Sequence, residues 1–219
     1  MSKKEEMNKM NAQVYLITVV FIIVSVSIIS AIVTFKLTKE NLKKQIKLDV
    51  TFEQMMKSEN NISKFLEKNK LNTGESIESI AKILNVEKGG IEKDLNEQAF
   101  LKEVDKEGRK IVVFKAGLSE KEERFVFAHE IAHLLNGDPI PVTRPDKHNK
   151  EQIEQLADYT AAALLMPLEE VYNFLNDNCY TRVSAKKRVA IIHKLCSKYE
   201  VTEIIALRRV KEIYELKQL

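Results

Sequence analysis

The feature that most constrains this chain is an uncharged segment of 22 residues near its start, Val14–Phe35. A helix of this length rises about 33 Å, at about 1.5 Å per residue, which matches the apolar layer of a bilayer. Buried helices of soluble proteins rarely run so long without a polar side, and the apolar region of a cleaved signal peptide is shorter, about 7–15 residues. The segment therefore predicts one transmembrane helix in contact with the lipid bilayer.

The charges on either side of this segment predict its orientation. Residues 1–13 carry a net charge of +1, residues 36–48 carry +4 and residues 49–219 carry −2, within a total of +3. Five lysines follow the segment and three precede it, so the positive-inside rule predicts a single-pass protein of the cell membrane with a cytoplasmic body. The faintly acidic body gives no sign of a nucleic-acid partner.

Residues 36–74 are rich in Lys, Glu and Asn, with apolar residues at imperfect helical spacing. This pattern favours a helical stalk with a surface for self-association, and a solvated linker is the equal alternative. The two cysteines, Cys179 and Cys196, are expected to be reduced in a cytoplasmic body, and to form a disulfide only if the body is exported.

Beyond the stalk, the pattern predicts an α+β domain that is mostly helical with a small antiparallel sheet. Apolar spacing predicts a helix over 76–86 that ends before Gly89 and Gly90, and residues 99–114 predict a hairpin with its turn at 105–108. Ser119 and Glu122 form a capping box for a helix that Gly137 should end. A further helix is expected from about 151 to 166, ended by Pro167, and helices over 168–219.

The helix that begins after Ser119 contains the motif H-E-x-x-H. His129 and His133 are four residues apart, so they share one face of the helix and can bind a single zinc ion. Glu130 is rotated by about 100° from His129, where it can act as the general base that takes a proton from a zinc-bound water. This spacing predicts the catalytic centre of a zinc peptidase.

A catalytic zinc site needs a third protein ligand, and the next helix offers one. Glu154 can complete a His-His-Glu set, with Glu151, one turn earlier, as the rival ligand. Asp158, one turn after Glu154, can accept a hydrogen bond from a ligand imidazole and fix its tautomer. His148 lies between the two helices. It is a candidate for stabilising the transition state, and a solvated loop histidine is the alternative.

These two blocks resemble the ImmA/IrrE family of small zinc-dependent peptidases. The resemblance rests on R-F-V-F-A-H-E-I-A-H-L-L at 124–135 and on E-Q-L-A-D-Y-T-A-A-A-L-L-M-P at 154–167. The second block departs at Leu156, where the family often has an acidic residue, and at Thr160, where phenylalanine is usual. The resemblance covers about 98–170 well and extends weakly to 199–210.

The sequence therefore predicts four parts of the chain: a tail at 1–13, a transmembrane helix at 14–35, a stalk or linker at 36–74, and a metallopeptidase domain at 75–219, with the first three outside the resemblance. That domain would have a core at 98–170 and a helical C-terminal part at 171–219. The resemblance to the ImmA/IrrE family implies cleavage of a helix-turn-helix transcriptional repressor, relieving repression after stress or in a mobile element. A regulatory module that keeps the fold and holds a repressor without cutting it is the alternative.

Overall fold

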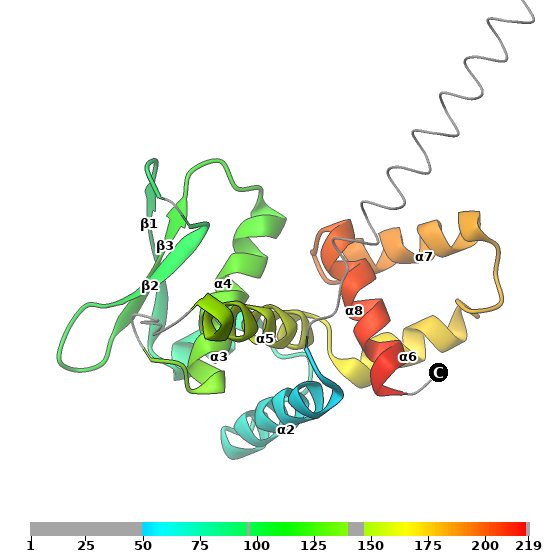
Figure 1. Ribbon diagram of the computed structural model, residues 1–219, viewed down its shortest axis with the longest axis horizontal. Coiled ribbons are helices and arrows are strands. Elements are labelled where there is room, and N and C mark those ends of the chain that lie inside the picture. The colour runs from blue at the N-terminus through cyan, green and yellow to red at the C-terminus, as the bar shows by residue number, and fades with distance from the viewer. Residues whose placement is uncertain (1–49, 96, 140–146, 218–219) are drawn as a thin grey trace, which may run out of the picture. The chain divides into compact units, whose positions relative to one another are not determined.

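The computed structural model describes residues 50–95, 97–139 and 147–217, all within one compact unit that spans Leu48–Leu219. Seven helices and three strands follow one another in these residues (Figure 1). Their bounds are α2 Phe52–Lys68, α3 Ile77–Ile83, β1 Val86–Glu92, β2 Ala99–Glu103, β3 Lys110–Lys115, α4 Glu120–Asn136, α5 Lys147–Leu165, α6 Leu168–Asp177, α7 Ala185–Lys198 and α8 Glu203–Leu216. The predicted α+β class, mostly helical, is confirmed.

The sheet has three strands in the order β1-β3-β2. The predicted hairpin is present, since β2 pairs antiparallel with β3, with Ala99 opposite Phe114. The prediction of a purely antiparallel sheet is wrong, because β1 adds a parallel pairing with β3. Gly89 and Gly90, expected to end a helix, lie inside β1, where the pairing with β3 is irregular between Lys88 and Ile91, and glycine is typical of such irregular positions in a strand.

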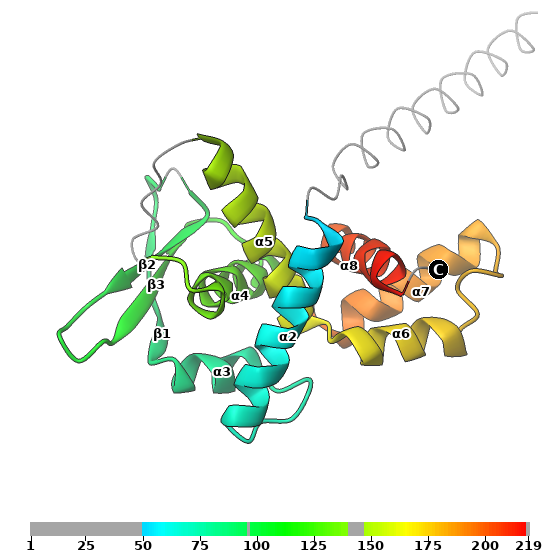
Figure 2. The same ribbon diagram turned by 60° about the horizontal axis from the view of Figure 1, so that its bottom comes forward.

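Helix α4 forms where the sequence predicts it. The Ser119 hydroxyl accepts from the Glu122 N–H while the Glu122 side chain accepts from the Ser119 N–H, and Gly137 ends the helix at φ +78°. One side of α4 packs on the sheet, with the rings of Phe127 and Phe114 6.2 Å apart between centroids. The opposite end of the described unit holds α6, α7 and α8, with α4 and α5 between them and the sheet (Figures 1 and 2).

Helix α5 packs directly on α4 through small side chains. Ala157 and Ala161 are fully buried, and side chains of this size let the two helix backbones approach closely. The helix begins at Lys147, about one turn before the predicted start, and Pro167 separates it from α6. This packing brings the second motif block against the first.

Helix α2 lies in the range expected to be a stalk or linker, and it packs against α5, α4 and α8. Met55 is 1% exposed, and the Ser58 hydroxyl forms a 2.7 Å hydrogen bond with the Thr160 hydroxyl of α5. The part of the predicted stalk that the structure describes is therefore integrated into the helical body, and it gives no support to self-association. The domain boundaries remain a prediction.

The predicted cell-membrane location needs correction. No helix among residues 50–95, 97–139 and 147–217 is long and apolar enough to cross a membrane. The segment Val14–Phe35 itself lies outside the described residues.

Cys179 is exposed and Cys196 is buried, and both are free, so the alternative of a disulfide between them is not borne out.

Candidate metal centre

Three of the predicted site residues meet where α4 packs on α5. His129 Nε2 lies 3.0 Å from Glu154 Oε2, and His133 Nε2 lies 3.1 Å from His129 Nε2 and 3.8 Å from Glu154 Oε2. Each of these side chains offers one ligand atom, and the three atoms lie within 4.8 Å of one another. Glu151, the rival ligand, is exposed and is not part of this group.

The spacing of these atoms fits a tetrahedral metal ion. Two ligand atoms that bind one zinc ion at about 2.0–2.1 Å lie about 3.3 Å apart. The three separations in the site, 3.0, 3.1 and 3.8 Å, lie on either side of this value. Two imidazoles and a carboxylate are also a ligand set that zinc uses in catalytic sites. The residues therefore fit the metal ion that the sequence predicts.

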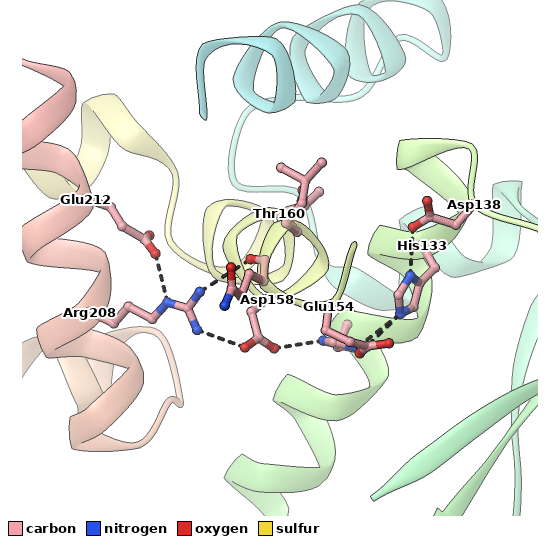
Figure 3. Close-up of polar contacts among 10 residues, drawn as sticks. His133, Asp138, Glu154, Asp158, Thr160, Arg208 and Glu212 are labelled. Atoms are coloured by element: carbon pink, nitrogen blue, oxygen red, sulfur yellow. Dashed lines mark hydrogen bonds and ion pairs between the residues drawn. The ribbon is translucent and has the colours of Figure 1, made fainter. Parts of the chain in front are cut away.

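The other nitrogen of each imidazole contacts a carboxylate. His129 Nδ1 lies 2.9 Å from Asp158 Oδ1, and His133 Nδ1 lies 2.8 Å from Asp138 Oδ2 (Figure 3). A carboxylate that accepts from Nδ1–H leaves Nε2 as the nitrogen that binds a metal once Nε2 has lost any proton, and keeps it aimed at the metal position. Asp158 thus contacts His129, and Asp138 makes the equivalent contact with His133.

Asp138 was missed in the sequence, although a local signal marks it. Gly137 adopts the left-handed conformation after α4, and the Asp138 N–H then donates to the His133 carbonyl at 2.9 Å. This turn carries the Asp138 side chain back over the last turn of the helix, to His133. The acidic residue directly after the glycine that ends the helix is the local signal for this contact.

Glu130 lies on α4 beside the ligand group and is 8% exposed. Burial raises the pKa of the Glu130 carboxyl above its ordinary value, against the opposing charges of His129 and His133. His148 belongs to the first turn of α5, but its side chain lies outside the described part of the chain, so its role stays a prediction.

In the absence of metal, electrostatics at the ligand group favours a protonated His129 beside an ionised Glu154. Although burial lowers it, the pKa of His129 rises to about 10 because Asp158 and Glu154 accept its hydrogen bonds. Burial raises the pKa of Glu154, but the hydrogen bonds from His129 and His133 outweigh burial and hold it well below its usual range. A metal ion that binds His129 Nε2 near neutral pH must therefore displace a proton.

This proton predicts a pH dependence. Below a pKa of about 10, each unit of pH changes the cost of deprotonating His129 by about 1.4 kcal/mol. We expect the apparent zinc affinity to rise about tenfold per unit between pH 6 and 8, as the proton becomes easier to remove. Competition with a chromophoric chelator at several pH values measures this. A flat profile would contradict the protonated His129, and His193→Ala, at an exposed histidine, is the control.

Comparison with known proteins agrees with this geometry. The family model described as the IrrE N-terminal-like domain, a peptidase-family domain, matches residues 90–211, more than half of the chain. No curated protein matches the chain.

Among solved structures, a transcriptional regulator from Mycobacterium tuberculosis matches with 14% identity and a TM-score of 0.47, over 78% of this chain and 50% of that one. The chain thus spans about half the length of that regulator, and a similarity of this degree says nothing about function. The family match alone identifies the domain as metallopeptidase-like. The chain belongs to the family of the IrrE N-terminal-like domain, in agreement with the ImmA/IrrE resemblance of its two motif blocks.

Proposed function

We propose that this chain is a zinc-dependent peptidase that hydrolyses a peptide bond of a helix-turn-helix transcriptional repressor. The observation that carries the proposal is the convergence of His129 Nε2, His133 Nε2 and the Glu154 carboxylate, with Glu130 beside them. The family to which the chain belongs supports a peptidase, and its resemblance to ImmA/IrrE proteins supports a repressor as the substrate.

The residues of the site would have different roles according to their positions. His129, His133 and Glu154 would hold Zn²⁺, which when bound supplies Lewis-acid chemistry, polarising the scissile carbonyl and lowering the pKa of water. Asp158 and Asp138 keep both imidazoles in the tautomer that presents Nε2.

Glu130 moves the proton. Its carboxylate takes a proton from the attacking water and passes it to the nitrogen of the leaving amine. Burial, which raises the pKa of Glu130, strengthens it as a base and lets it retain the proton between these two steps.

The test is incubation of the full chain with the repressor encoded beside its gene. We expect one bound zinc per chain and two repressor fragments of fixed masses, with no fragments after the metal is removed by a chelator. Mass spectrometry of the products measures both the cleavage and its position. Zinc binding with a stable complex and an intact repressor would contradict hydrolysis and favour a regulatory binding module instead.

A further inference from the structure

A residue from outside the two motif helices also reaches the metal centre. Arg208 lies on α8, and its Nη1 donates to Asp158 Oδ2 at 2.8 Å (Figure 3). The other oxygen of the same carboxylate, Oδ1, contacts His129 Nδ1 at 2.9 Å. The two oxygens of Asp158 therefore have one partner each, an imidazole on one side and a guanidinium on the other.

The guanidinium of Arg208 is itself held at two further points. Its Nε donates to Glu212 Oε1 at 3.0 Å, and its Nη2 donates to the Gln155 carbonyl at 3.4 Å. Glu212 is fully buried, and the Arg208 side chain is 16% exposed. Three contacts in different directions leave this planar group one orientation.

We propose that Arg208 is a positioning residue for the metal centre: it fixes the Asp158 carboxylate in the orientation that turns His129 Nε2 toward Glu154 and His133. Asp158 is 33% exposed, so without Arg208 water can solvate the oxygen that faces α8 and the carboxylate can rotate. Rotation of the carboxylate releases the His129 ring. The consequence for catalysis rests on the proposed function, whereas the consequence for metal binding can be measured without a substrate.

The size of the effect follows from the distance of Arg208 from the metal position. Loss of a carboxylate that contacts a ligand imidazole costs about 10–100-fold in metal affinity. Arg208 contacts this carboxylate and not the imidazole itself, so we expect the lower end of that range, a loss of about tenfold in metal affinity. Arg208→Lys should restore part of this loss, because an ammonium can reach Asp158 but cannot hold the carboxylate and Glu212 in the same fixed geometry.

The variants must separate positioning from folding. Arg208→Met alone takes away the 3.0 Å partner of the buried Glu212 and leaves it only the 3.6 Å ion pair with Arg209, and a buried carboxylate that loses its closest partner destabilises the fold. The double variant Arg208→Met/Glu212→Gln removes both charges together. Arg188→Met is the matched control, because Arg188 lies on α7, donates to the Thr181 carbonyl and lies over the Tyr180 ring, away from the ligand group.

The experiment measures zinc affinity of the full chain by chelator competition, the visible spectrum of the Co²⁺-loaded protein and the thermal unfolding midpoint. We expect the double variant to fold, to bind zinc about tenfold more weakly and to show a shifted Co²⁺ spectrum. Arg208→Lys should be intermediate, and Arg188→Met should match the wild type. A folded double variant with wild-type zinc affinity and Co²⁺ spectrum would overturn the positioning role.

These readouts keep the two proposals apart. If the wild type binds zinc and the double variant binds it more weakly, the positioning role stands even if no repressor is cut, and only the proposed function fails. If the wild type cuts its substrate and the double variant keeps full zinc affinity, only the positioning role fails. A wild-type chain that binds no zinc would overturn both.

Discussion

Glu130→Gln is expected to bind zinc at wild-type stoichiometry and to lose about 10²–10⁴-fold in kcat for repressor cleavage. Glutamine has nearly the same shape as glutamate, so α4 and the ligands on it should be undisturbed. Its amide cannot take a proton from water, however, and the group that delivers a proton to the leaving amine is lost. Zinc analysis of the purified variant, followed by single-turnover cleavage, measures both parts of this expectation.

The control for this variant is Glu120→Gln, the same substitution at an exposed position in the first turn of the same helix. It should cleave at the wild-type rate. If Glu130→Gln retains zinc and cuts as fast as the wild type, Glu130 is not the general base. Loss of zinc from the variant would instead show that Glu130 helps to hold the ligand group.

The sequence predicts α4 and its motif well because every determinant is local. The capping box, the glycine at the end and the spacing of His129 and His133 all lie within 19 residues of one helix, Ser119–Gly137. Periodicity and capping act over such distances. The position of Glu130 beside the ligand group follows from the same helical geometry, without knowledge of the rest of the fold.

Contacts between distant segments could be predicted where a motif marks both partners, as for Glu154 and His129, but not where no motif does. Strand β1 contains two glycines and no alternating pattern, so its strand conformation depends on its pairing with β3, about 24 residues later. Arg208 is 50 residues from Asp158 in the sequence, and an arginine in a C-terminal helix carries no local sign of its partner. Both features exist only because the chain packs as it does.

Thr160 shows how a departure from the family pattern can be explained by such a contact. The family usually has phenylalanine here. In this chain Thr160 is 1% exposed. Its hydroxyl forms hydrogen bonds with the Ser58 hydroxyl, the Asn136 side chain and the Leu156 carbonyl. A buried hydroxyl needs such partners. The smaller side chain therefore agrees with the close packing of α2 on α5.

We expect a large effect on stability at Glu59, which lies on α2. Its Oε1 accepts from Arg209 Nη2 and from the Tyr159 hydroxyl, both at 2.7 Å, and Arg209 is fully buried. Arg209 also donates to the Met166 carbonyl, lies over the Tyr159 ring and forms an ion pair with Glu212 at 3.6 Å, while its Nη1 has no hydrogen bond. Among the described residues, Glu59 is therefore the carboxylate that holds Arg209 most closely, whereas Glu212 Oε2 stays 3.6 Å away and forms no hydrogen bond.

Glu59→Ala should therefore lower the free energy of unfolding by about 3 kcal/mol, the lower end of the range for breaking a buried ion pair, since Glu59 is partly exposed. Chemical denaturation of the full chain measures it. Glu67→Ala, at an exposed position on the same helix, should change the free energy by no more than about 0.5 kcal/mol. A loss below 1 kcal/mol would mean that the contacts of Glu59 with Tyr159 and Arg209 do not stabilise the packing of α2 on α5 and α8. Because Glu59 contacts neither Arg208 nor Asp158 directly, the folded Glu59→Ala protein should keep its zinc affinity, unlike the Arg208 variants.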